Sequence, residues 1–212
     1  VENKQKFKRN VSLLLRELAE EKNHSWTHYY LAAEYYRSNE FNKAFEHVNQ
    51  SIELFINEGI IPPPSMLYSL KYSILMETGS WEGAWPGIKS AVKMYPDYVD
   101  LKFYMGVILY YKKMYQEALD CFRKCLELGE SNLNYLTIKG LGSFSAWFYA
   151  GLCFEELKNE EEAFLAYLKA LIISNNYIPA REAITKLINM HPSLADRIKY
   201  LKPEFMRLLE SN

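Results

Sequence analysis

The 212-residue sequence has few of the residues that punctuate β-structure and few that build disulfide frameworks. It contains only 8 Pro, 9 Gly and 3 Cys, whereas a β-sandwich or barrel needs frequent turn residues between its strands. Three cysteines do not form a closed disulfide set. All three, Cys121, Cys125 and Cys153, fall in apolar stretches, where a free cysteine packs as a small hydrophobic residue. These absences favour an all-α protein with reduced thiols, and reduced thiols predict a cytoplasmic location.

The sequence also lacks an excess of charge and a long hydrophobic run. Its 25 basic and 26 acidic side chains leave a net charge of −1, which gives no long-range attraction to nucleic acid or anionic lipid. It has no stretch of about 18 apolar residues, so no membrane span is predicted. Residues 1–10 are polar and basic, unlike a signal peptide. The chain starts with Val1 inside a helical pattern, and we expect it to be part of a longer protein.

Alanine recurs at the same place in four consecutive segments. Three residues before it stands an aromatic side chain in three segments and a glutamate in the fourth. The four pairs are Phe41 and Ala44, Trp81 and Ala84, Tyr115 and Ala118, and Glu160 and Ala163. The alanines lie 40, 34 and 45 residues apart, and self-similarity at a period of about 20–50 residues marks a repeat architecture.

The residues around each alanine keep one order of small and large side chains. Four residues after it the side chain is bulky: Val48, Ile88, Phe122 and Tyr167. Seven residues after it the side chain is small: Ser51, Ala91, Cys125 and Ala170. Twelve residues before it stand Ala32, Tyr72, Gly106 and Gly151, of which three are small. Small residues let two antiparallel helices approach closely, and bulky ones fill the space between neighbouring hairpins.

Over residues 26–176 this pattern resembles the tetratricopeptide repeat family, whose period is about 34 residues. The resemblance implies an all-α, right-handed α-solenoid of tandem antiparallel helical hairpins. We expect the hairpins to pair helices 26–38 with 41–56, 65–78 with 81–94, 99–113 with 115–128, and 144–157 with 160–174. An apolar stripe at Val11, Leu14, Leu15 and Leu18 predicts a further helix over 7–21, and a proline near its start predicts another over 179–190.

We therefore expect one tetratricopeptide-like domain over residues 1–212. Residues 1–22 would form a helix of a partial repeat, and residues 25–58, 65–98, 99–130 and 144–176 four full repeats. Residues 177–212 would cap the stack, with two short helices over 193–200 and 203–210. The end repeats of such stacks need a polar outer face.

Two insertions interrupt the repeats. Residues 57–64 end in three prolines, which predict an extended spacer; a docking site for a proline-binding module is the alternative. Residues 129–143 carry Gly140 and Gly142 just before an expected helix. We expect a packed loop there, and the alternative is an anion site on free backbone amides. The spacing of a P-loop or a dinucleotide-binding motif is absent.

Three stretches carry a second, narrower resemblance. Residues 95–101, 118–129 and 140–147, together with the long link between the third and fourth hairpins, look like the repeat region that follows the catalytic domain of bacterial family-2 glycosyltransferases. The resemblance covers roughly residues 10–180. It implies a non-catalytic accessory region, with an upstream catalytic domain and a glycosyl acceptor as partners. The chain itself has no Asp-x-Asp triplet, so no catalytic residue carries over.

No set of side chains with the spacing of a catalytic or metal site is present. His24 and His28 lie four residues apart, but no carboxylate or cysteine completes a zinc set at ligand spacing. Cys121 and Cys125 occupy packing positions of the repeat. No nucleophile, base and orienting group are marked together. We therefore predict no catalytic residue, no metal, no cofactor and no enzyme activity for this chain.

The first helices of the hairpins are the predicted binding surface, because they line the inner face of a helical-repeat stack. The side chains expected there are rich in aromatic rings, which dominate binding hot spots. They are Trp26, Tyr29, Tyr36, Arg37, Met76, Phe103, Tyr110, Tyr111 and Phe148. Ordinary packing between helices is the alternative for several of them. Tetratricopeptide domains that bind the carboxyl-terminal tails of heat-shock chaperones use a lysine–asparagine clamp on these inner faces. The matching positions here hold Tyr29 and Ala33, Ser69 and Ser73, and Phe103 and Val107, so chaperone-tail binding is not expected.

The predicted function is to bind a protein, a peptide or a glycosyl acceptor in this aromatic groove, as the C-terminal accessory region of a glycosyltransferase. A freestanding scaffold for protein assembly, unrelated to sugar transfer, is the alternative.

Overall fold

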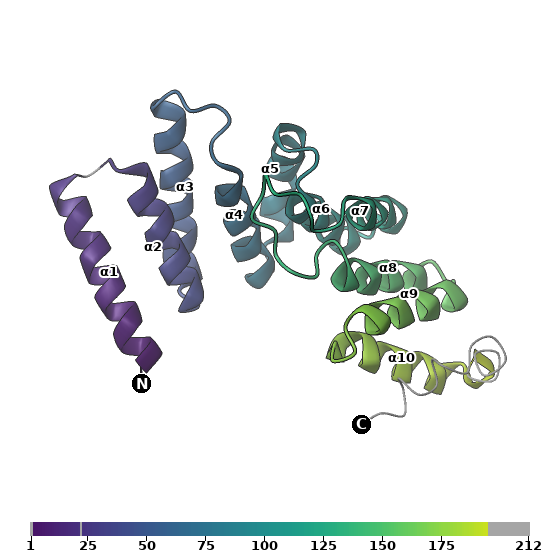
Figure 1. Cartoon of the computed structure of the whole chain (residues 1–212). Helices are drawn as coiled ribbons and strands as arrows, with labels where there is room; N and C mark the ends of the chain where they lie inside the picture. Colours follow the sequence, from purple (N-terminus) through teal and green to yellow (C-terminus); the bar gives the residue numbers. More distant parts are fainter. Residues whose placement is uncertain (1, 22, 195–212) are drawn as a thin grey trace. The chain divides into compact units, whose positions relative to one another are not determined.

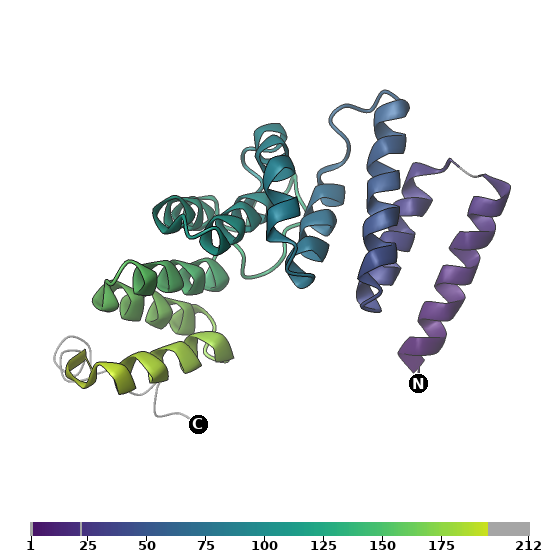
Figure 2. The same cartoon turned by 180° about the vertical axis from the view of Figure 1, so that it is seen from behind.

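The computed structural model describes residues 2–21 and 23–194, which contain the α-helices α1 to α10, a further helical segment over residues 192–194, and no strand (Figures 1 and 2). The helices are α1 (Glu2–Glu20), α2 (Ser25–Arg37), α3 (Phe41–Asn57), α4 (Ser65–Glu77), α5 (Trp81–Met94), α6 (Val99–Tyr111), α7 (Tyr115–Leu128), α8 (Phe144–Glu156), α9 (Glu160–Ile173) and α10 (Ile178–Met190). The predicted all-α fold of antiparallel helical hairpins is confirmed.

The predicted helix boundaries agree with these bounds to within one or two residues in the four hairpins. The first helix starts at Glu2, before the predicted start at Phe7. The helices expected over 193–200 and 203–210 lie almost entirely outside the described residues. The division into one domain with four repeats stays a prediction.

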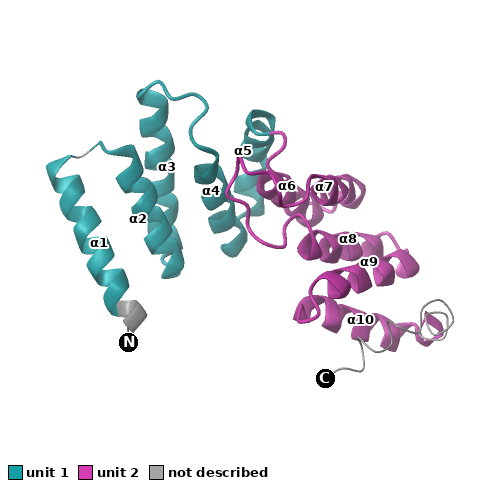
Figure 3. Cartoon of the chain, viewed as in Figure 1, with its two compact units in different colours: residues 1–95 teal, residues 96–212 magenta. Residues whose placement is uncertain are grey.

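The chain forms two compact units, residues 1–95 and 96–212 (Figure 3). In the first unit α2 pairs with α3 and α4 with α5, and α1 packs against α2. In the second unit α6 pairs with α7 and α8 with α9, and α10 packs against α9. Each unit has its own hydrophobic core. Val48 and Phe55 are central to the first core, and Tyr167 and Ile184 to the second.

Small residues face bulky ones where paired helices come closest. A Cβ atom added at Gly151 of α8 would lie 2.3 Å from the ring of Tyr167 of α9, and one added at Gly106 of α6 would lie 2.7 Å from the ring of Phe122 of α7. Both contacts are too short for any side chain. The small and large positions predicted from the repeat therefore meet in the structure, and they fix how closely the two helices approach.

The two helices of the α4–α5 hairpin also approach closely, but here the bulky residue lies on the first helix and the small residue on the second. Tyr72 occupies the place on α4 where other repeats have Ala or Gly, and its hydroxyl lies 2.8 Å from where a Cβ of Gly87 on α5 would stand. The large side chain has moved to the first helix and the small residue to the second. This explains the one exception in the sequence pattern.

A hydrogen bond from the second helix of a hairpin to the start of its first helix also occurs in both units. Ser51 Oγ donates a hydrogen bond to the carbonyl oxygen of Ser25 at 2.8 Å, and Cys125 Sγ donates to the carbonyl oxygen of Val99 at 3.8 Å. In both cases a small, buried side chain on the second helix meets the first residue of its partner helix. Small size at this position thus serves both close approach and hydrogen bonding.

Candidate functional site

The first unit carries a row of aromatic side chains along α2. Trp26, Tyr29 and Tyr36 are each partly buried and partly open to solvent. The Trp26 ring packs edge-on against Phe55 of α3, with 5.0 Å between centroids, and stacks on Tyr30 at 6.4 Å. Tyr30 is 51% exposed. One side of each ring is therefore anchored in the protein, while the other side remains accessible.

The row continues from α2 onto α4, because these two first helices contact each other. Tyr36 of α2 is hydrogen-bonded to Ser73 of α4, and burial raises the pKa of the Tyr36 hydroxyl, with nearby Glu77 adding to the rise. Met76 of α4 is half-buried and Glu77 is exposed. Predicted groove residues of two successive hairpins thus share one surface in the first unit.

In the second unit the structure separates the predicted groove residues into buried and accessible ones. Phe103 is only 6% exposed; its ring packs edge-on against Phe122 at 5.6 Å and Tyr149 at 5.3 Å. This places Phe103 in the core rather than on an accessible surface, because α7 and α8 both cover it. Phe148 is half-buried against Tyr167 and Tyr177.

Tyr110 and Tyr111 lie at the carboxyl end of α6 within a tyrosine cluster. Tyr111 is 48% exposed, and the Tyr110 ring contacts Tyr111 at 5.5 Å, Tyr115 at 5.7 Å and Tyr149 at 6.3 Å between centroids. Burial, followed by the nearby Glu156 carboxylate, raises the pKa of Tyr110 to about 12. Tyr149 had not been predicted, since it follows directly on Phe148 and the repeat pattern assigns only one of them to the inner face.

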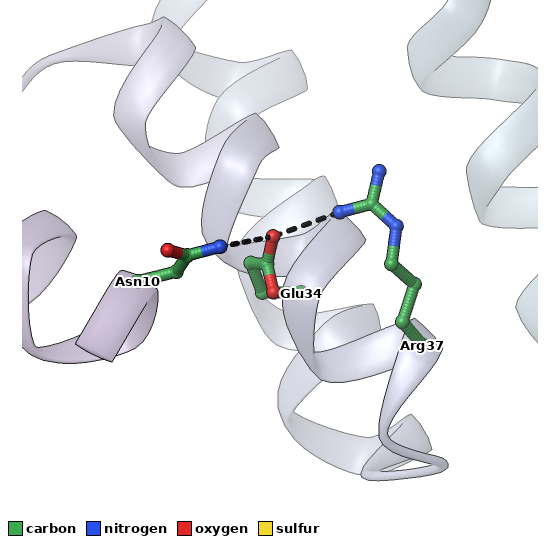
Figure 4. Close-up of polar contacts among 3 residues, drawn as sticks. All are labelled: Asn10, Glu34 and Arg37. Carbon is green, nitrogen blue, oxygen red and sulfur yellow. Dashed lines mark hydrogen bonds and ion pairs between the residues drawn. The ribbon is translucent and has the colours of Figure 1, made fainter. Parts of the chain in front are cut away.

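A cleft of about 830 Å³ opens between α1 and the carboxyl end of α2. Within it, Glu34 Oε1 accepts hydrogen bonds from Asn10 Nδ2 at 3.2 Å and from Arg37 Nη1 at 2.8 Å (Figure 4). The Glu34 side chain is 16% exposed and that of Arg37 is 66% exposed. The lining residues are Lys6, Phe7, Asn10, Glu34, Arg37, Ser38 and Glu40.

Sequence reasoning found only Arg37 in this cleft. The spacing of Glu34 and Arg37, three residues apart on one helix, could have indicated an ion pair. The contact with Asn10 had no local signal, because Asn10 lies 24 residues away on another helix.

The insertion between α7 and α8 is a packed loop whose glycine amides are already occupied. Glu130 Oε1 accepts hydrogen bonds from the backbone nitrogens of Gly140 at 2.8 Å and Gly142 at 3.1 Å, and from Ser143 Oγ at 2.7 Å. The chain's own carboxylate thus takes the place that the alternative prediction gave to an external anion. The anion-site alternative is wrong for this reason.

The middle of the same loop is held against the start of α6 by a ring stack and hydrogen bonds. Tyr135 stacks on Tyr98 with 4.4 Å between ring centroids, and the Tyr98 hydroxyl donates to the carbonyl oxygen of Leu136 at 2.7 Å. The backbone nitrogen of Ile138 donates to the buried Asp100 carboxylate at 3.2 Å. A long loop without regular structure is therefore held by side chains of the helix it crosses.

The proline-rich connector before α4 also packs onto its own unit. Pro63 is buried, and the Tyr95 hydroxyl donates a hydrogen bond to the Pro63 carbonyl oxygen. Pro62 remains exposed. Because the central proline is covered, the connector fits the predicted spacer better than a docking motif for a proline-binding module, which would need the prolines accessible.

The contacts of His24 and of the cysteines are those of helix capping and core packing. His24 Nδ1 accepts from the backbone nitrogen of Thr27 at 3.2 Å and caps α2. Burial raises the pKa of Cys121 to about 11 and that of Cys153 to about 12, which disfavours the nucleophilic thiolate. Among residues 2–21 and 23–194, no three His, Cys, Asp or Glu side chains group as metal ligands, and no helix is long and apolar enough to cross a membrane.

Comparison with known proteins agrees with this architecture. A sequence model of the tetratricopeptide repeat family matches residues 99–132, which correspond to the third predicted repeat. No curated protein sequence matches the chain significantly.

Solved structures with the same fold share little sequence with the chain. YrrB, described as a TPR protein with an unusual peptide-binding site, is 18% identical with a TM-score of 0.65, over 84% of each chain. A structure of the APC/C hetero-tetramer Cut9–Hcn1 is 17% identical with a TM-score of 0.71, over 98% of this chain and 40% of that one. MamA from Desulfovibrio magneticus RS-1 is 14% identical with a TM-score of 0.64, over 89% and 96% of the two chains.

The chain therefore has the helical-repeat fold of tetratricopeptide proteins. Residues 99–132, which form α6, α7 and the start of the loop after them, are a tetratricopeptide repeat by sequence as well as by structure.

Proposed function

We propose that this chain is a non-catalytic binding module that holds a peptide or a protein segment on the aromatic surface of its first helices. The observation that carries the proposal is the row of half-exposed aromatic side chains on α2, which continues onto α4 through the hydrogen bond between Tyr36 and Ser73. Tyr and Trp offer large contact areas with few rotatable bonds. Rings that are already anchored lose little conformational entropy when a partner binds.

Two of the structural relatives support this proposal. The YrrB description names a peptide-binding site, and the Cut9–Hcn1 structure is a hetero-tetramer of different chains. Both are statements about those proteins. They support a binding role for the present chain through the fold that it shares with them.

A display selection with random peptides tests the proposal. We expect the wild-type chain to enrich binders, and Tyr36→Ala to weaken their binding about ten-fold or more while lowering the melting temperature less than the loss of a buried ring does, since Tyr36 is partly exposed. Phe103→Ala is the matched control: it removes a buried ring and should lower the melting temperature strongly. If Tyr36→Ala instead leaves peptide affinity unchanged, the α2 surface is not the binding surface.

The narrower proposal is that the chain is the C-terminal accessory region of a bacterial family-2 glycosyltransferase in the cytoplasm. Its support is the likeness of residues 95–101, 118–129 and 140–147 to that repeat region. The partners would be an upstream catalytic domain and a glycosyl acceptor. Sugar transfer by the full-length parent, with and without these repeats, tests it. Loss of acceptor use without the repeats is expected, and equal transfer would favour the freestanding scaffold for protein assembly.

A further inference from the structure

We propose that the cleft between α1 and the end of α2 binds a carboxylate group of the peptide partner, and so gives the module a preference for acidic peptides. This inference rests on the proposed function, because it names the chemistry of the segment that the first-helix surface would hold. The cleft has a volume of about 830 Å³, which is ample for a Glu or Asp side chain with its neighbouring backbone.

The ion pairs around the cleft leave one positive charge over. Glu34 is paired with Arg37 at 2.8 Å, and Glu40 is paired with Lys43 at 2.6 Å. Lys6 also lines the cleft and its side chain is exposed. The described charged side chains in and beside the cleft are thus Lys6, Arg37 and Lys43 against Glu34 and Glu40, and this excess of positive charge favours an incoming anion over a cation.

Arg37 is held in position to receive such an anion. Only Nη1 of its guanidinium contacts Glu34, and Glu34 is itself fixed by the hydrogen bond from Asn10 on the neighbouring helix. A guanidinium has five N–H donors in a rigid fork. The donors not directed at Glu34 are available to a carboxylate, and the fixed geometry lowers the entropy lost on binding.

The cleft and the proposed aromatic surface share helix α2. Arg37, which lines the cleft, lies on the same helix as the aromatic row, and its charge acts to lower the pKa of the Tyr29 hydroxyl, against a larger rise caused by burial. Phe7 adds a partly buried ring to the floor of the cleft. A peptide that lies along α2 can therefore place an acidic residue between Lys6 and Arg37 and its apolar residues on the aromatic rings.

The experiment compares peptides that the intact chain selects from a random library with amidated carboxyl ends. We expect the selected peptides to be rich in Asp and Glu. For the best binder, a Glu→Gln change in the peptide or Arg37→Gln in the protein should each weaken binding about ten-fold or more, and added salt should weaken it further.

Arg123→Gln is the matched control. Arg123 is also exposed and also pairs with an acidic residue three positions earlier, Asp120, at 3.2 Å, but it belongs to the other unit and does not line the cleft. It should leave peptide affinity unchanged. If Arg37→Gln and Arg123→Gln lower the peptide affinity equally, the net charge of the protein explains the loss and the proposed site is wrong.

A second library with free carboxyl ends distinguishes the two sources of a carboxylate. Binding by both libraries assigns the cleft to acidic side chains, whereas binding by the free-acid library alone assigns it to the end of a chain.

Selected peptides without acidic preference would refute the carboxylate site and leave the binding function standing. If Glu34→Gln weakens binding while Arg37→Gln strengthens it, the cleft binds a cation and our inference is wrong. Failure to select any peptide would refute both proposals.

Discussion

Gly151 shows how a single hydrogen atom in place of a side chain sets the distance between α8 and α9. A Cβ there would meet the ring of Tyr167, which is fully buried and has no room to turn aside. We expect Gly151→Ala to lower the free energy of unfolding of the second unit by about 1–3 kcal/mol, as overpacking does. Chemical denaturation followed by circular dichroism measures it.

Gly83→Ala is the control for this substitution. Gly83 also lies within a helix, but an added Cβ meets no atom within 4 Å. Because alanine is the better helix former, this change should stabilise the first unit by about 0.5–1 kcal/mol. Similar effects of both changes would mean that helix propensity, and not the contact with Tyr167, decides the outcome at Gly151.

The His28–His47 pair makes the stability of the first unit depend on pH. The two Nδ1 atoms lie 2.9 Å apart, so one ring donates and the other accepts. Burial, followed by the neighbouring His28, lowers the pKa of His47 below its usual 6.5, with Glu46 opposing the shift. The unfolded chain therefore binds more protons just below pH 6.5, and the contribution to stability, present above that pH, is lost as pH falls towards the lowered pKa.

Urea unfolding at about pH 7.5 and about pH 5.5 measures this dependence. The wild-type midpoint should drop at the lower pH, and His47→Gln should show a smaller drop, because the group that gains a proton on unfolding is gone. The same drop in both proteins would assign the pH dependence to other groups, such as the carboxylates.

At the scale of elements, the loop of residues 129–143 depends on one carboxylate for its order. Glu130 accepts three hydrogen bonds, two of them from the backbone nitrogens of Gly140 and Gly142. We expect Glu130→Ala to speed hydrogen exchange at these two amides at least ten-fold, since hydrogen bonds to charged groups contribute about 1.5–3 kcal/mol. Ser131→Ala, an exposed neighbour in the same loop, should leave their exchange unchanged. Unaltered protection in Glu130→Ala would mean that the contacts with Tyr98 and Asp100 hold the loop alone.

The hairpins show what can be predicted at this scale and what cannot. Their bounds were predictable because the repeat places small and bulky residues at fixed intervals, and each helix must bury the bulky ones. The hydrogen bonds that hold the loop were not predictable: no local pattern marks Glu130, in the loop, or Asp100, in α6, as a hydrogen-bond acceptor for the loop backbone, and their partners lie 10 and 38 residues away.

At the scale of the whole molecule, two compact units each have a core of their own. We expect residues 96–212 expressed alone to be helical and to unfold cooperatively, because Phe164, Tyr167 and Leu171 are buried against helices of the same unit. A thermal melt followed by circular dichroism is the measurement. A gradual loss of signal without a transition would show that this unit needs the first one to fold.

The sequence by itself determined the all-α class, the four hairpins and the packing positions within them. These follow from periodic patterns, in which each residue reports on neighbours within about one repeat. Only the tertiary structure decided that Phe103 is buried, that the glycine amides are taken by Glu130, and that Asn10, Glu34 and Arg37 meet at one cleft. Each of these depends on contacts between helices distant in sequence, where exposure and hydrogen bonding are set by which surfaces come together and not by any local pattern.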